Sequence, residues 1–185
     1  SGGLVTAVTE LSDGRLVMML DVERVLSEIA GIDSSHLYTQ IQPLTNHNET
    51  VVFVDDSHVA RKQVEKTLEV LNVKSMGAIN GSEAWTMLRQ MADYAESSGT
   101  PLRQTLGAVI TDIEMPEMDG YMLTRNIKSD PRFTGIPVIM HSSLSGMSNQ
   151  GLGRSVGVDE YVSKFEPRRL AEVLTRFLGA QPQSA

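Results

Sequence analysis

The chain has 185 residues, with 16 basic against 23 acidic side chains and a formal net charge of −7 at pH 7. This charge argues against a nucleic-acid binder, which needs Lys and Arg to displace counterions from phosphates. The absence of cysteine excludes disulfides, thiolate catalysis and cysteine-based zinc sites, and it fits the reducing cytoplasm. With 41% hydrophobic residues the chain can bury a sizeable core, and no apolar run is long enough for direct membrane insertion. It opens Ser1-Gly2-Gly3 without an initiator methionine, so we expect a piece of a longer protein.

The first segment, residues 4–20, predicts a β-hairpin, because two runs rich in β-forming residues flank the turn-forming cluster Ser12-Asp13-Gly14. Asp21 is placed to cap a short helix directly after the hairpin. The apolar residues of this helix recur with helical spacing, at Val22, Val25, Leu26 and Ile29.

Residues 31–49 predict a linker, because they combine polar residues with Gly and Pro and show weak periodicity. We expect a short ordered patch within this linker around Leu37 and Ile41. The hydrophobic pattern of the sequence changes after residue 50, where short apolar runs begin to alternate with helical stretches.

Five of these apolar runs predict β-strands, at residues 51–54, 75–79, 108–111, 137–140 and 161–163. Apolar residues at helical spacing predict helices over residues 59–71 and 82–95, and a last helix that starts at Pro167. Strands that are apolar on both faces and alternate with helices predict a parallel sheet covered on both sides. The fold class is therefore α/β, with one doubly wound domain built around five parallel strands.

Polar side chains stand at the carboxyl ends of the predicted strands, where ligands bind in open α/β sheets. The first strand ends in Asp55 and Asp56, the third in Asp112, the fourth in Ser142 and the fifth in Lys164. Because the carboxyl ends of parallel strands meet at one edge of the sheet, we expect these side chains to converge there. Taken alone, each has a simpler interpretation as a helix cap or a solvated charge.

Three neighbouring carboxylates raise one another's pKa unless a cation is present. A hard divalent ion with oxygen ligands meets that need, and Mg²⁺ suits carboxylates together with a phosphate oxygen. A carboxylate beside Mg²⁺ can attack a phosphoryl group, which makes Asp112 a candidate for an aspartyl phosphate. Lys164 would then pair with one phosphoryl oxygen, and Ser142 would donate a hydrogen bond to another. The four histidines show no metal-ligand spacing, and we expect them to be structural or exposed.

Four motifs, "VDDS", "TDIEMPEMDG", "PVIMHSS" and "YVSK", resemble in this order those of the response-regulator receiver domain. The resemblance covers residues 50–179 and implies the CheY-like, flavodoxin-like strand order 2-1-3-4-5. It implies that Asp112 accepts a phosphoryl group from a histidine kinase of a two-component system. It also implies Asp55 and Asp56 as the acidic pair, with Asp56 the more direct metal ligand, and the backbone carbonyl of Glu114 as a further ligand.

The same resemblance assigns the remaining roles. Ser142 takes the position of the switch hydroxyl, Tyr161 that of the aromatic side chain that reports phosphorylation, and Lys164 that of the phosphate-pairing lysine. Asp119 is expected to cap the helix that follows the acceptor loop.

One position departs from the family pattern, which has a proline directly after the lysine, often with a cis peptide bond. Here Phe165 follows Lys164, and the proline is delayed to Pro167. A cis bond before a residue other than proline costs roughly 2.5–4 kcal/mol, so we predict a trans Lys164–Phe165 bond. The placement of Lys164 then has to be established from the structure.

The N-terminal segment has a resemblance of its own, because residues 2–26 are similar to the closing hairpin and final helix of CheW-like coupling domains. A coupling domain followed by a receiver resembles the layout of CheV chemotaxis scaffolds. This implies a coupling-domain fragment over residues 1–30, a linker over 31–49, a receiver over 50–179 and a tail over 180–185. The implied partners are a CheA-like histidine kinase and, through the coupling domain, chemoreceptors. Because the hairpin has exposed strand edges, we expect it to pair with another chain, as in a dimer, or to dock on the receiver.

Three functions compete on these residues. The favoured one is a phosphorylation-controlled binding module that retains its phosphoryl group and is therefore not an enzyme. The alternative is a Mg²⁺-dependent phosphatase of haloacid-dehalogenase type. That chemistry places a second carboxylate two residues after the nucleophile on the first strand, whereas Asp55 and Asp56 are adjacent and the best acceptor is on the third strand. The third function is that of a degenerate receiver acting as a constitutive scaffold. The presence of all three acidic residues argues against this function, whereas the departure at Phe165 leaves it as an alternative.

Overall fold

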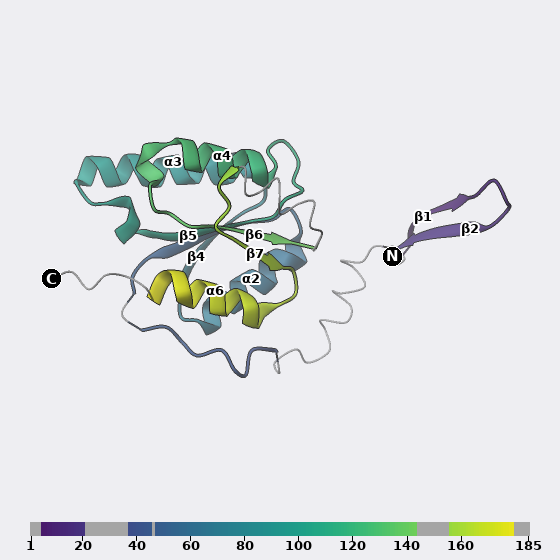
Figure 1. Cartoon of the computed structure of the whole chain (residues 1–185), viewed down its shortest axis with the longest axis horizontal. Helices are drawn as coiled ribbons and strands as arrows, with labels where there is room; N and C mark the ends of the chain where they lie inside the picture. Colours follow the sequence, from purple (N-terminus) through teal and green to yellow (C-terminus); the bar gives the residue numbers. More distant parts are fainter. Residues whose placement is uncertain (1–4, 21–36, 46, 144–155, 180–185) are drawn as a thin grey trace. The chain divides into compact units, whose positions relative to one another are not determined.

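The computed structural model describes residues 5–20, 37–45, 47–143 and 156–179 (Figure 1). The chain divides into two compact units, Ser1–Thr39 and Gln40–Ala185. The predicted short helix after Asp21 and the tail over residues 180–185 lie outside the described residues. Within the described ranges, no helix is both long enough and apolar enough to traverse a lipid bilayer.

The first unit contains the predicted hairpin. Strands β1 (Val5–Glu10) and β2 (Leu16–Leu20) pair antiparallel around a turn in which Gly14 has a φ of +82°. The turn is closed by a 2.8 Å hydrogen bond that the Leu11 amide donates to the Arg15 carbonyl. The hairpin carries exposed apolar side chains, among them Val8, Leu16 and Met18. A partner chain for these side chains, or a docking site on the receiver, stays a prediction.

The second unit is built on five parallel strands in the order β4-β3-β5-β6-β7. Numbered within this unit, the order is 2-1-3-4-5, so the predicted fold class and topology are confirmed. The observed strands agree with the predicted runs to within two residues at each end. They are β3 (Thr50–Val54), β4 (Lys74–Ala78), β5 (Leu106–Thr111), β6 (Val138–Ser142) and β7 (Glu160–Ser163).

Four described helices cover this sheet (Figure 1). Helices α3 (Gly81–Ser98) and α4 (Gly120–Ser129) lie on one face, and α2 (His58–Val70) and α6 (Pro167–Gly179) lie on the other. The predicted start of α6 at Pro167 is confirmed. So is the cap by Asp119, whose carboxylate accepts a 2.7 Å hydrogen bond from the Met122 amide. Short 3₁₀ turns at Leu102–Gln104 and Pro131–Phe133 precede β5 and β6.

The core lies on both sides of the central strands. Every residue of β5 and β6 is buried, and the α3–α4 face packs large apolar side chains against them, including Leu88, Leu123 and Phe133. Strand β4 is different, because only Ala78 is buried and Met76 is 42% exposed. The sheet is covered by helices on both sides as predicted, and β4 is nevertheless a largely exposed strand. It lies at the edge of the sheet, where β3 is its single neighbour.

The second half of the predicted linker packs against the larger unit. Ile41 is buried, and the Leu44 amide donates a 2.8 Å hydrogen bond to the carbonyl of Leu71, just after α2. This agrees with the predicted ordered patch around Ile41. The proposed domain limits at residues 30, 49 and 179 stay predictions.

Gly120 lies where the start of α4 passes close to the acceptor strand. A Cβ at this position would overlap the backbone oxygen of Asp112. Because that oxygen cannot rotate away, we expect Gly120→Ala to lower the free energy of unfolding by about 1–3 kcal/mol. Gly179, at the end of α6, has open space at the corresponding position, so Gly179→Ala is the matched control. Urea unfolding measures both, and equal stability of the two variants would contradict the close approach.

Candidate functional site

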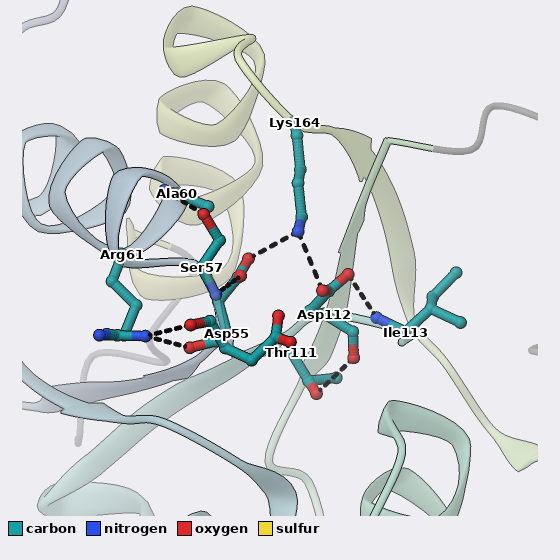
Figure 2. A network of polar contacts seen from close by, with 9 residues as sticks. Asp55, Ser57, Ala60, Arg61, Thr111, Asp112, Ile113 and Lys164 are labelled. Atoms are coloured by element: carbon teal, nitrogen blue, oxygen red, sulfur yellow. Dashed lines mark hydrogen bonds and ion pairs between the residues drawn. The ribbon is translucent and has the colours of Figure 1, made fainter. Parts of the chain in front are cut away.

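The carboxyl ends of three strands bring Asp55, Asp112 and Lys164 together (Figure 2). Val54 is paired with Thr111 in the parallel register of β3 and β5, so the residues that follow them, Asp55 and Asp112, emerge side by side. The Lys164 ammonium lies 2.9 Å from Asp112 Oδ2 and 3.0 Å from Asp55 Oδ2. All three side chains are nearly completely buried. The structure thus gathers these predicted site residues at one edge of the sheet.

Asp56 completes a group of three carboxylates. Asp55, Asp56 and Asp112 each offer a ligand oxygen, and these oxygens lie within 4.8 Å of one another. Asp56 is exposed to solvent, whereas the other two are buried. Lys164 donates a hydrogen bond to Asp112 Oδ2 and pairs with Asp55 Oδ2 at 3.0 Å, so one ammonium faces both buried carboxylates. Three clustered carboxylates with one ammonium leave negative charge that a cation would neutralise, so the oxygen ligands fit a hard divalent metal.

Backbone groups fix the orientation of the Asp112 carboxylate. The Ile113 amide donates a 2.7 Å hydrogen bond to Asp112 Oδ1, which leaves Oδ2 facing Lys164. The Asp112 amide donates to the carbonyl of Val54 at 2.9 Å, and the Thr111 hydroxyl donates to the Asp112 carbonyl at 2.9 Å. With main chain and side chain both held, the carboxylate has one defined direction in the pocket (Figure 2).

Arg61, on the second turn of α2, holds the loop that carries the acidic pair. Its guanidinium donates hydrogen bonds to the carbonyls of Asp55 at 2.7 Å and of Asp56 at 2.9 Å (Figure 2). The Ser57 amide donates to Asp55 Oδ1 at 2.9 Å, and the Ser57 hydroxyl caps α2. Sequence reasoning missed Arg61. The available signal was a cation six residues after Asp55, on a helix that starts directly at the strand end.

The link from β7 to α6 departs from the family pattern as the sequence indicated. None of the described peptide bonds is cis, so the predicted trans Lys164–Phe165 bond is confirmed. Phe165 instead adopts a φ of +66°, a left-handed conformation that is uncommon for residues other than glycine. The Lys164 amide donates a 3.0 Å hydrogen bond to the Ser142 carbonyl, which ties the end of β7 to the end of β6. Lys164 thus reaches both carboxylates without a proline after it.

The other predicted residues lie around this centre. Ser142 is buried at the end of β6, opposite Ser163 in the register with β7. Tyr161 is half-buried in β7, and Glu114 is exposed in the loop after β5. Their positions agree with the assigned roles, but the switch function of Ser142 and Tyr161 and the metal contact of the Glu114 carbonyl stay predictions.

Burial and mutual charge shift the titration of the central groups. Burial raises the pKa of Asp55 to about 6, with the Lys164 charge opposing this rise and the Asp112 charge adding to it. Burial likewise raises the pKa of Asp112, against the opposing effect of Lys164. For Lys164 itself burial favours the neutral amine, but the two carboxylates outweigh it and its pKa is raised. The pocket therefore holds one ammonium against an excess of acidic groups.

His141 lies one residue before Ser142 and is also buried. Burial, reinforced by the Lys164 charge, lowers its pKa to about 3. His141 is therefore neutral throughout the physiological range. This agrees with the expectation that the histidines are structural or exposed.

Asp55→Asn tests the cost of the buried acid in metal-free buffer. Because the folded-state pKa of about 6 lies above the ordinary aspartate pKa of 3.8, folding favours the protonated acid. Its stabilisation is complete below about pH 4 and is lost as the pH rises through 6. The neutral Asn avoids this loss, so we expect Asp55→Asn to exceed wild type in unfolding free energy by about 1–3 kcal/mol at pH 7.5, with the gap closing towards pH 4.

Urea unfolding at several pH values, with a chelator present, measures this gap. Glu96→Gln, on the exposed side of α3, is the control for loss of one negative charge. A gap that stays constant with pH, or that grows towards acid, would be inconsistent with a raised pKa for Asp55.

Arg61→Met should weaken divalent-ion binding, because the carbonyls of Asp55 and Asp56 lose the guanidinium that fixes them. Loss of a residue that orients metal ligands typically costs a factor of ten or more, and we expect roughly tenfold here. Calorimetric titration with Mg²⁺ or Mn²⁺ gives the affinity. Lys62→Met removes the same charge from the exposed neighbouring position and is the control. If both variants bind the ion equally well, Arg61 has no such role.

Comparisons with known proteins bear on this arrangement. A family model described as the response regulator receiver domain matches residues 51–175. Chemotaxis protein CheV1 of Helicobacter pylori is 31% identical over 172 residues, which cover 92% of this chain and 51% of that protein. Chemotaxis protein CheY1 of the same organism is 34% identical over 131 residues, covering 70% of this chain and 96% of that protein. The chain thus spans about half the length of CheV1 and nearly all of CheY1.

Solved structures give the same family. The receiver domain of the histidine kinase CKI1 from Arabidopsis thaliana, complexed with Mg²⁺ and BeF3⁻, has a TM-score of 0.63 and 26% identity, covering 71% of this chain and 90% of that one. Chemotaxis protein CheY4 of Vibrio cholerae, at 24% identity and a TM-score of 0.58 over 70% of this chain and 98% of that one, shares the fold. These relatives give no support to the haloacid-dehalogenase alternative. With its family match, its CheY-like topology and its strand-end acidic pocket, the chain belongs to the response-regulator receiver family.

Proposed function

We propose that the chain is a phosphorylation-controlled signalling receiver that accepts a phosphoryl group on Asp112. The observation that carries this proposal is the orientation of the Asp112 carboxylate. One oxygen is held by the Ile113 amide, and the other faces Lys164 within a group of three acidic side chains. A fixed carboxylate beside an ammonium and two metal-ligating acids has the parts that phosphoryl transfer needs, namely positioning and charge neutralisation.

The metal in this proposal is Mg²⁺, held by Asp56, Asp112 and the Glu114 carbonyl, with Asp55 beside them. When bound, the ion neutralises negative charge on the phosphoryl oxygens. The three clustered carboxylates, two of which share the single Lys164 ammonium, support this assignment. Arg61 contributes by fixing the backbone on which Asp55 and Asp56 stand.

The residues of the chain divide the chemistry among them. An oxygen of Asp112 forms a bond to phosphorus while the bond from phosphorus to the donor atom breaks and the donor keeps the electron pair. The Lys164 ammonium, already 2.9 Å from this carboxylate, pairs with a phosphoryl oxygen as charge develops there. The product is an acyl phosphate that remains on the chain. Turnover of an external substrate is therefore not part of the function, and the protein acts as a binding module rather than an enzyme.

In this proposal the receiver signals by a change in its surface around β6 and β7. Ser142 ends the strand next to the acceptor strand, and Tyr161 lies on the strand beyond it. A hydrogen bond from Ser142 to the phosphoryl group would draw the end of β6 inward, and Tyr161 would follow into the space. Phosphorylation then biases an equilibrium between two conformations.

The cellular context of the proposal is bacterial chemotaxis in the cytoplasm. The similarity to CheV1 over most of the chain and to CheY1 over the receiver supports a CheA-like histidine kinase as phosphoryl donor. The coupling-domain resemblance of the N-terminal segment supports contact with chemoreceptors. Both partners are part of the proposal for the longer protein.

Asp112→Asn tests the proposal. With Mg²⁺ and acetyl phosphate, intact mass spectrometry should show one added phosphoryl group on the wild type and none on the variant, because Asn lacks the nucleophilic oxygen. A chelator should abolish the wild-type adduct, and a chromogenic phosphate ester should not be turned over. Labelling of Asp112→Asn to the wild-type level, or catalytic release of phosphate, would overturn the proposal.

A further inference from the structure

A second tyrosine, Tyr121, is hydrogen-bonded through its hydroxyl to the hydroxyl of Tyr161. Tyr161 lies in β7, opposite Met140 of β6, and Tyr121 is the second residue of α4. Helix α4 follows β5, and β6 separates β5 from β7 in the sheet. The hydroxyl pair therefore links the helix that follows β5 to β7, and these two strands flank β6, the strand that ends in Ser142.

Backbone contacts connect the start of α4, where Tyr121 lies, to the loop that follows the phosphoacceptor. The amide of Gly120, the residue before it, donates a 2.9 Å hydrogen bond to the carbonyl of Ile113, which directly follows Asp112. Asp119 caps the same turn of α4 through the Met122 amide. The tyrosine hydroxyl thus projects from a helix start that the acceptor loop holds in place.

A second contact ties the other end of α4 to the β7 side of the sheet. Lys128, in the last turn of α4, lies 2.6 Å from Asp159, which directly precedes β7. The same Asp159 carboxylate accepts a 2.7 Å hydrogen bond from the amide of Val138, at the start of β6. Helix α4 is thus linked to β7, or to the residue just before it, at both of its ends.

We propose that Tyr121 is a positioning residue for Tyr161. Its hydroxyl holds the Tyr161 side chain towards α4, on the β6 side of β7, before any phosphoryl group is present. The switched conformation is thereby partly populated in the unmodified protein, and the receiver takes up phosphate more readily. This inference rests on the proposed function of Asp112 and adds a specific partner for Tyr161 to it.

The chemistry of the Tyr121–Tyr161 pair suits a constant bias on the two-state switch. Burial raises the pKa of Tyr121, the bond from Tyr161 opposes that rise, and the Asp119 charge adds to it. The raised pKa keeps the Tyr121 hydroxyl protonated at physiological pH, and a tyrosine hydroxyl can donate one hydrogen bond and accept another. A single neutral hydrogen bond changes a two-state population by roughly twofold to tenfold. The contact is strong enough to bias the switch and too weak to lock it.

Tyr121→Phe removes the hydroxyl and keeps the ring. Tyr94→Phe is the matched control, because Tyr94 is 70% exposed on α3. Two readouts are needed: the rate of Asp112 phosphorylation by acetyl phosphate with Mg²⁺, and the NMR resonances of ring-¹³C-labelled Tyr161, assigned with Tyr161→Phe. Mg²⁺ affinity and urea unfolding, measured on the same variants, separate a positioning role from a general loss of structure.

We expect Tyr121→Phe to be phosphorylated roughly twofold to tenfold more slowly than wild type, with unchanged Mg²⁺ affinity. Its Tyr161 resonance in the unmodified protein should move away from the position reached with Mg²⁺ and beryllium fluoride, whereas Tyr94→Phe should match wild type. Tyr161→Phe, which breaks the same bond from the other side, should show the same slower rate.

Equal rates and equal Tyr161 resonances in Tyr121→Phe and Tyr94→Phe would overturn this inference while leaving Asp112 as the acceptor. A wild-type protein that takes up no phosphoryl group would instead overturn the proposed function. In that case the unmodified-state resonance still decides whether Tyr121 positions Tyr161. An unchanged resonance would refute the positioning role.

Discussion

The ion contacts of Lys164 with Asp55 and Asp112 are the constraint on which the rest of the site depends. Buried charges are costly unless they are paired, and here one ammonium lies 2.9 Å and 3.0 Å from two carboxylates. The three residues come from β3, β5 and β7, so the contacts form only when the strands have this order. Because one ammonium cannot neutralise two carboxylates together with Asp56, the pocket keeps an excess of negative charge. The fold thus already contains the excess of negative charge that the metal ion of the proposed phosphoryl transfer would neutralise.

Three further groups fix the positions of the acidic residues that Lys164 contacts and of the elements around them. The Ile113 amide fixes one oxygen of Asp112, Arg61 fixes the backbone of the acidic pair, and Gly120 lets α4 start against the acceptor strand. Phe165, in a left-handed conformation, occupies the position where the family usually has proline. Lys164 reaches both carboxylates with this local backbone, at 2.9 Å from Asp112 and 3.0 Å from Asp55.

Much of the fold and site follows from local patterns in the sequence. Short apolar runs between helical stretches predict the five strands to within two residues, and polar residues at the strand ends predict the edge where they meet. The exposure of β4 follows from its place at the sheet edge, which the strand order implied by the resemblance gives and which local patterns alone do not. The contacts of Arg61 with backbone carbonyls and of Tyr121 with Tyr161 are tertiary, and no spacing within one segment encodes them.

The most direct test of the central claim is a crystal structure of the protein with Mg²⁺ and beryllium fluoride, a phosphoryl mimic. The account predicts the beryllium adduct on Asp112, the metal beside Asp56 and Asp112, and the Lys164 ammonium in contact with a fluorine of the adduct. An adduct on a different carboxylate, or a Lys164 side chain directed away from it, would contradict the account.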